Sequence, residues 1–140
     1  KYPALLLLSI PSTIIYMCRS FAIEHDCGHQ NLFNHKLTND FFGSLLGFGI
    51  GIPYQMWKFI HKSHHNNVGN LTFRNLNTEI WTMTLQEYKG ASSVKQLLYR
   101  FMRSKFTRLV LTPTINYGIV FRLVHPKYNL ASIISVLLHN

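Results

Sequence analysis

Acidic side chains are scarce in this sequence. Its 140 residues contain 5 Asp and Glu against 14 Lys and Arg, which gives a formal net charge of +9. Such a basic balance indicates an anionic partner, either nucleic acid or a lipid surface. Nucleic-acid binding is disfavoured because no RNP, zinc-finger or basic-zipper pattern is present and because residues 2–18 and 41–57 carry no charge. A soluble basic domain with a buried helical core is the remaining alternative.

Cysteine is nearly absent as well. Cys18 and Cys27 form neither a CxxC pair nor a framework of paired cysteines, which argues against a disulfide-stapled domain and a cysteine-held zinc site. They weakly indicate a reducing compartment. The sequence also lacks an initial methionine and stops inside the apolar run 133–138, so we expect it to be a fragment of a longer protein.

Two long uncharged runs are present instead. As a helix, residues 2–18 would extend about 25 Å at 1.5 Å per residue, close to the hydrocarbon core of a bilayer. Lysines and arginines lie between the apolar runs, as they do in the cytoplasmic loops of membrane proteins. We therefore expect an all-α fold, an integral membrane helical bundle with re-entrant or interfacial helices, of which residues 1–140 form one partial domain.

The second uncharged run contains glycines at a spacing of four residues. Gly43, Gly47 and Gly51 would share one face of a helix, and small residues in this pattern let a second backbone approach closely. The stretch Gly49–Pro53 is suited to a turn. The glycine spacing therefore favours close packing against another helix, with plain loop flexibility as the alternative.

The rest of the chain alternates between basic and apolar segments. Residues 94–102 predict an amphipathic helix lying on lipid headgroups, and residues 109–121 are too short to span comfortably, so we expect a re-entrant or interfacial segment. A further span is expected to begin at Leu130. Three aromatic residues fit a belt at the membrane interface: Tyr54, Trp57 and Trp81.

Five of the eight histidines fall into two tight groups. His25 and His29 are four residues apart, while His61, His64 and His65 follow the spacing i, i+3 and i+4, so each group shares one helix face. Two neighbouring faces of imidazoles can form a metal site, and neutral imidazole suits zinc, copper, iron or nickel. Ionisable groups beside apolar spans are costly and tend to be functional. The residue types alone do not select the metal.

The position of the groups relative to the bilayer constrains this hypothesis. If residues 41–57 crossed the membrane once, the two histidine groups would lie on opposite sides and could not share a metal. The hypothesis therefore requires the glycine-rich segment to turn back or to lie in the interface. Basic residues flank both groups, which predicts that both lie on the cytoplasmic side. These residues are Lys36, Lys58, Lys62 and Arg74.

The stretches EHDCGHQNLF and WKFIHKSHHNNVGNL resemble the first and second histidine boxes, HxxxH and HxxHH, of the acyl-lipid fatty acid desaturases. Within that family the similarity is greatest to the omega-6 (delta-12) type, and NTEIWTMTLQEYKG is also similar. The family has a third box, HxxHH, and nothing here matches it, since His125 and His139 stand alone. We attribute this departure to truncation and expect the fragment to be inactive on its own.

The resemblance implies an oxidoreductase that uses O2 to introduce a double bond into a fatty acyl chain. It implies two non-haem irons, with ferredoxin or cytochrome b5 as electron donor. By the same resemblance the iron ligands are His25, His29, His61, His64 and His65.

Two carboxylates stand beside the first group. Glu24 and Asp26 could accept hydrogen bonds from imidazole and orient the ligands, or could be plain solvated charges. Related histidine-box hydroxylases and carotenoid oxygenases remain alternatives. So does a non-catalytic membrane protein that binds zinc or senses pH.

Overall fold

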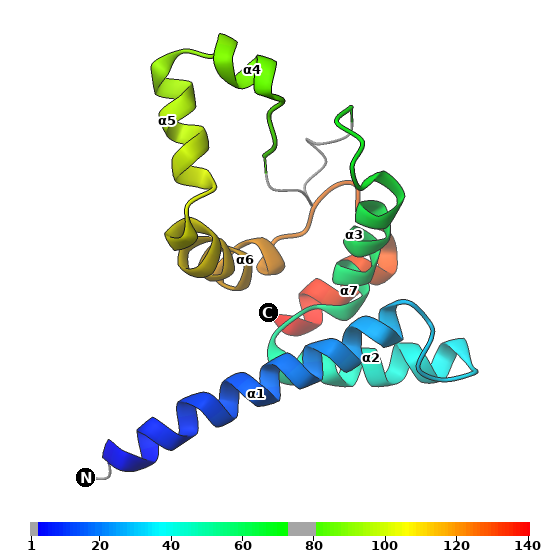
Figure 1. The fold of residues 1–140 in the computed structure, drawn as a ribbon. Helices are drawn as coiled ribbons and strands as arrows, with labels where there is room; N and C mark the ends of the chain where they lie inside the picture. The colour runs from blue at the N-terminus through cyan, green and yellow to red at the C-terminus, as the bar shows by residue number, and fades with distance from the viewer. Residues whose placement is uncertain (1–2, 73–80) are drawn as a thin grey trace. The chain divides into compact units, whose positions relative to one another are not determined.

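The computed structural model describes residues 3–72 and 81–140, with side chains from residue 5 onward, and within these ranges the chain forms helices and no strand. The predicted all-α class is confirmed. Contacts divide the chain into two compact units, residues 1–58 with 124–140, and residues 59–123. Figure 1 shows the helices in chain order.

The first unit begins with a long apolar helix. α1 spans Pro3–Gly28 and continues through Pro11. Its segment Leu5–Gly28 is the one helix among the described residues that is long and apolar enough to cross a membrane. Most of its large side chains are exposed, with Leu7 at 74%, as expected of a surface that meets hydrocarbon rather than water. The predicted first span is therefore present as a helix of suitable length, while the multi-pass arrangement stays a prediction.

The glycine-rich segment forms a second helix and then turns. α2 spans Lys36–Ile50 and packs along α1 (Figure 1). It ends at Gly51, whose φ of 78° lies in the left-handed region that glycine adopts most easily. The Ile52 amide donates to the Gly47 carbonyl at 2.8 Å, and α3, Tyr54–Asn67, starts directly after Pro53. The turn predicted at residues 49–53 is confirmed.

Two of the spaced glycines bring α2 against the start of α3. A Cβ atom on Gly43 would lie 2.3 Å from the Tyr54 ring, and one on Gly47 would lie 2.5 Å from the Ile52 carbonyl oxygen. Any side chain at these positions would collide with the neighbouring segment. The predicted close approach is thus confirmed for Gly43 and Gly47, whereas Gly51 serves as the helix cap.

Tyr54 and Trp57 are core residues, so their assignment to an interfacial belt is wrong. Tyr54 is 0% exposed and Trp57 is 9% exposed. The Trp57 ring packs edge-on against Phe21 of α1 at 5.5 Å between ring centroids. Two large aromatic rings buried in the first turn of α3 hold that turn firmly against its neighbours.

α7, Leu130–His139, joins the same unit through two buried serines. Ser132 Oγ donates to the Gln55 carbonyl at 3.1 Å, and the Gln55 amide donates to Ser135 Oγ at 3.3 Å. The second bond satisfies one of the first-turn amides that a helix cannot pair internally. At ten residues α7 is shorter than the roughly 20 residues of a membrane span.

The second unit consists of short helices. α4 spans Leu85–Gly90 and begins with a capping box, in which Thr84 accepts from the Glu87 amide and Glu87 accepts from the Thr84 amide. α5 spans Ser93–Met102 and leaves Val94 77% exposed. A helix is thus present where the amphipathic helix was predicted, while its position on lipid headgroups stays a prediction.

The following segment is broken into η1, Thr107–Leu111, α6, Thr112–Gly118, and η2, Val120–Arg122. None of these pieces has the length of a membrane span, in agreement with the prediction that residues 109–121 do not cross a bilayer as one helix.

Candidate metal centre

The first histidine pair lies at the end of α1. His25 is in the last turn, and the His29 amide extends the helical pattern by donating to the His25 carbonyl at 3.1 Å. The two Nε2 atoms are 3.3 Å apart. Neutral imidazole has one donor and one acceptor nitrogen, whereas two protonated rings at this distance would repel each other. The pair is therefore arranged for a shared proton or a shared cation.

The same arrangement recurs on α3. His61 and His65 are one helical turn apart, and their Nε2 atoms are 3.1 Å apart. The ring centroids are separated by 4.5 Å in both pairs. Each pair therefore presents two imidazoles side by side, as the four-residue spacing predicts.

Four of the five predicted ligands could hold a metal ion together. One ring nitrogen from each of His25, His29, His61 and His65 lies within 4.8 Å of the other three. Imidazole nitrogens bind first-row metals at about 2 Å, so ligands around one ion lie about 3–4 Å apart. The four nitrogens therefore form a group of the kind that could hold a metal ion. His64 is not a member of this group.

Trp57 packs on α1 and lies on the same face of α3 as His61 and His65. Its ring lies 5.8 Å from the His25 ring, and a Cβ atom on Gly28 would come within 2.6 Å of it. Trp57, His61 and His65 follow at intervals of four residues and so share one helix face. The face that packs on α1 is thus the face that carries the second pair. The space left by Gly28 receives the Trp57 ring.

The two predicted orienting carboxylates differ in position. Asp26 Oδ1 lies 3.5 Å from His25 Nδ1, the ring nitrogen opposite the one that faces His29. A carboxylate there can accept from Nδ1 and hold the ring's tautomer. Glu24 is 0% exposed and lies toward α2, where a Cβ on Gly47 would be 3.0 Å from its Oε1. Its carboxylate oxygens have no hydrogen-bond partner among the described residues. Both roles remain predictions.

Sequence reasoning missed Asp40, which lies near the start of α2. Its carboxylate accepts hydrogen bonds from Gln30, Tyr54 and Lys58. Burial alone would raise the pKa of Asp40, but the Lys58 ammonium and the three hydrogen bonds outweigh it and lower the pKa. No local pattern distinguishes this aspartate, because its partners lie 10, 14 and 18 residues away.

The other residues singled out in the sequence have simpler surroundings. Cys27 is buried at 0% exposure, and His35 is exposed at the N-cap of α2. Of the basic residues expected to mark the cytoplasmic side, Lys36 and Lys62 are exposed. The predicted marker Arg74 lies outside the described residues.

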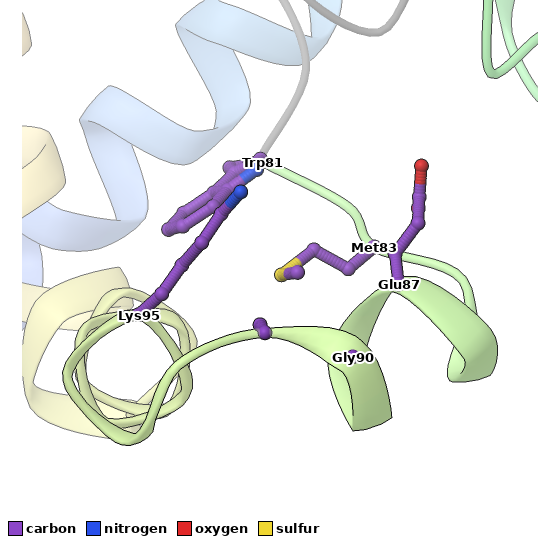
Figure 2. A pocket seen from close by; sticks show the side chains of 6 residues that line it. Trp81, Met83, Glu87, Gly90 and Lys95 are labelled. Atoms are coloured by element: carbon purple, nitrogen blue, oxygen red, sulfur yellow. The ribbon is translucent and has the colours of Figure 1, made fainter.

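A pocket of about 290 Å³ lies beside α4 and α5, and no histidine lines it (Figure 2). Its lining consists of Trp81, Met83, Glu87, Gly90, Ala91 and Lys95. Glu87 is engaged in the capping box, where its Oε2 accepts from the Thr84 amide at 2.7 Å. The pocket therefore offers no set of metal ligands, and the histidine group remains the candidate site.

Comparison with known proteins points to one family. The profile of the family described as "Fatty acid desaturase" matches residues 2–136. A fatty acid desaturase of Bacillus subtilis (strain 168) is 38% identical over 110 residues, which cover 76% of this chain and 31% of that protein. An sn-1 acyl-lipid omega-3 desaturase (ferredoxin) of Nostoc sp. (strain 36) is 32% identical over 108 residues, covering 77% of this chain and 24% of that protein.

A third relative bears on the type of reaction. The oleoyl-12-hydroxylase of Ricinus communis is 35% identical over 51 residues, covering 36% of this chain and 13% of that protein. The chain thus spans about a third or less of the length of these relatives. No solved structure matches it significantly.

Proposed function

Because the chain belongs to the fatty acid desaturase family, we propose that it is the part of a membrane-bound desaturase that carries the first two sets of iron ligands. The observation that carries this proposal is the group of four histidines, two at the end of a membrane-length apolar helix and two on α3. The proposed reaction is the oxygen-dependent introduction of a double bond into a fatty acyl chain.

The donor set fits iron. Imidazole is a suitable ligand for iron, and four nitrogens within 4.8 Å of one another leave room for further ligands. When bound, a pair of non-haem irons would supply the activation of O2 and the removal of two hydrogens from the acyl chain, with O2 reduced to water. We propose His25, His29, His61 and His65 as the main metal ligands and His64 as a fifth ligand. Ligands beyond these are expected from the remainder of the full-length protein.

The residues around the ligands have positioning roles. Asp26 would accept a hydrogen bond from His25 Nδ1, which keeps the Nε2 lone pair directed at the metal. The Trp57 ring lies 5.8 Å from the His25 ring and is itself 9% exposed, so it would limit the access of water to that side of His25. Water exclusion on that side strengthens electrostatic interactions inside the site.

We further propose that the histidine groups lie on the cytoplasmic side of the membrane and receive electrons from an acidic donor protein. Ferredoxin is favoured because the Nostoc relative is named as ferredoxin-dependent, and cytochrome b5 is the alternative. The sequence has no acidic residue after Glu87. A positively charged surface of this kind speeds association with an acidic partner.

The second candidate function is hydroxylation of the acyl chain, favoured by the similarity to the oleoyl-12-hydroxylase. The histidine group would serve both reactions, because they differ in whether oxygen remains on the product. Product analysis distinguishes them.

The test uses the full-length protein that contains this chain, produced in a host that supplies oleoyl lipids and a ferredoxin system. Iron content is measured after purification in detergent and anaerobic reconstitution with Fe(II), and fatty acids are identified by gas chromatography and mass spectrometry. We expect bound iron and a new double bond in the wild type. His25→Ala and His61→Ala should each lose the product and most of the iron.

His35→Ala is the matched control, because His35 is exposed and lies outside the group of four. It should retain both iron and product. Uptake of zinc alone, or full iron retention in His61→Ala, would contradict the proposal.

The membrane position is tested separately by labelling in sealed vesicles. Lys36→Cys and Asn66→Cys place thiols at exposed positions near the two histidine groups. In a background with Cys18→Ser, which removes the exposed native thiol, both should react with an impermeant maleimide from the cytoplasmic side. Labelling of the two positions from opposite sides would rule out a shared metal.

A further inference from the structure

One oxygen atom of Asp40 is bound by three segments of the chain. Gln30 Nε2 donates to Asp40 Oδ1 at 3.0 Å, the Tyr54 hydroxyl donates at 3.1 Å, and the Lys58 ammonium donates to the same oxygen. Gln30 follows α1, Asp40 belongs to α2, and the other two donors lie in the first two turns of α3. A single carboxylate oxygen therefore joins the ends of three elements.

Gln30 connects Asp40 Oδ1 to the first histidine pair, His25 and His29. It directly follows His29, and its φ of 62° is uncommon for a residue other than glycine. Both its amide and its side-chain Nε2 donate to the Cys27 carbonyl at 2.9 Å, which closes the end of α1. Such a backbone conformation persists only where the surroundings hold it. The bond to Asp40 is one of the contacts that hold it.

Lys58 connects Asp40 Oδ1 to the second histidine pair, because it lies on the same helix as His61 and His65. Lys58, His61 and His65 follow the spacing i, i+3 and i+7 on α3, so they lie along one side of the helix. A register change of a single residue rotates an α-helix by about 100° and moves it by about 1.5 Å. The direction of His61 and His65 therefore depends on how the start of α3 is oriented.

Apolar packing brings the start of α3 against α1 and α2, and the hydrogen bonds to Asp40 define its rotation more sharply than that packing does. Tyr54 against Gly43 keeps α3 close to α2, but hydrophobic attraction has no preferred direction. Hydrogen bonds weaken steeply when they are bent, so two donors one turn apart on α3 that share one acceptor define its rotation. The side chains of Asp40 and Lys58 are each 21% exposed, so water competes only weakly for them.

We propose that Asp40 is a positioning residue for the histidine metal site: by binding Gln30, Tyr54 and Lys58 at once, it sets the rotation of α3 and so directs His61 and His65 toward His25 and His29. Asp40 acts through its three donors and is not among the candidate ligands, because the group of residues that could hold a metal ion does not include it. The identity of the metal rests on the proposed function, whereas the geometric role does not.

The test measures Co(II) binding to the full-length protein in detergent under anaerobic conditions. The visible absorption of Co(II) reports both affinity and ligand geometry. Asp40→Asn keeps the shape of the side chain but removes its charge, and Lys58→Met removes the partner. Loss of residues that orient ligands typically weakens metal binding by about 10- to 100-fold, so we expect about tenfold in each single variant, with shifted absorption bands.

The combined variant and a matched control separate positioning from a general effect. Since the two residues act as one unit, Asp40→Asn with Lys58→Met should be no worse than either single change. Lys62→Met removes the same charge from an exposed position on the same helix and should leave affinity and spectrum unchanged. Additive losses, or the same loss in Lys62→Met, would overturn the proposal.

A milder variant is available should Asp40→Asn not fold. Tyr54→Phe removes only the hydroxyl and keeps the ring in place beside Gly43, so about a threefold loss of Co(II) affinity is expected from one hydrogen bond. Unchanged affinity and spectrum in a folded Asp40→Asn, or in Tyr54→Phe if Asp40→Asn does not fold, would refute the positioning role. A wild type that binds Co(II) as expected but takes up no iron would instead refute the proposed function and leave the role of Asp40 standing.

Discussion

Substitution of Gly43 by alanine gives the sharpest test of how α2 and α3 fit together. In an exposed helix interior this change stabilises by about 1 kcal/mol, because glycine has more backbone freedom to lose. In this structure the added Cβ would lie 2.3, 2.4 and 2.8 Å from three ring atoms of Tyr54. Carbon atoms in contact are normally about 3.5–4.0 Å apart, so the ring or the helix must move by more than 1 Å.

Tyr54 has no free space into which it can move. It is 0% exposed, and its hydroxyl is held by Asp40 at 3.1 Å. Overpacking of this kind costs about 1–3 kcal/mol, and loss of the hydroxyl's hydrogen bond costs about 1 kcal/mol more. The gain in helix preference offsets about 1 kcal/mol of this, so we expect Gly43→Ala to lower the free energy of unfolding by about 1–3 kcal/mol.

The assay is thermal unfolding of the full-length protein in detergent, followed by the size-exclusion profile after heating. For a domain of 150–250 residues such a loss corresponds to a midpoint lower by about 2–12 °C. Gly49→Ala is the matched control on the same helix, since its Cβ would meet only the Tyr16 hydroxyl, at 3.1 Å, on a side chain that is 54% exposed and can shift. The reasoning is refuted if Gly43→Ala unfolds at the same temperature as Gly49→Ala or above it.

Two further predictions concern charge and local structure. Because the folded-state pKa of Asp40 is lowered from 3.8, its contribution to stability should be fully present above about pH 3.8 and lost as pH falls through the folded pKa. Unfolding curves of wild type and Asp40→Asn should therefore differ near pH 6, begin to converge below about pH 3.8 and meet once the pH is below the folded-state pKa. A difference that stays constant with pH would contradict this. Thr84→Ala removes the capping box of α4 and should cost about 1 kcal/mol locally. Hydrogen exchange of residues 85–90 should accelerate while Co(II) affinity stays unchanged, and weaker Co(II) binding would show that α4 acts on the site.

The candidate ligands were predictable because their arrangement is local. His25 with His29, and His61 with His65, are one helical turn apart, so side-by-side imidazoles follow once the segments are helical. The apolar character of α1, the amphipathic face of α5 and the turn before Tyr54 were predictable for the same reason. Each depends on residues within a few positions of one another.

Other features depend on contacts between distant residues and could not be deduced from local spacing. Trp57 of α3 fills the space at Gly28 and lies beside His25. One ring nitrogen from each of four histidines lies within 4.8 Å of the others, and His64 is not among them. The HxxHH spacing does not predict that His64 is left out.

The sequence by itself determined which residues could bind a metal, because helical periodicity fixes the face on which each side chain lies. Only the tertiary structure decided what those faces meet. Asp40 gathers donors from 10 to 18 residues away, and Ser135 pairs with Gln55 across 80 residues. Such partners come together through the shapes and hydrogen bonds of packed helices. The periodicity of the sequence does not indicate which distant residues will meet.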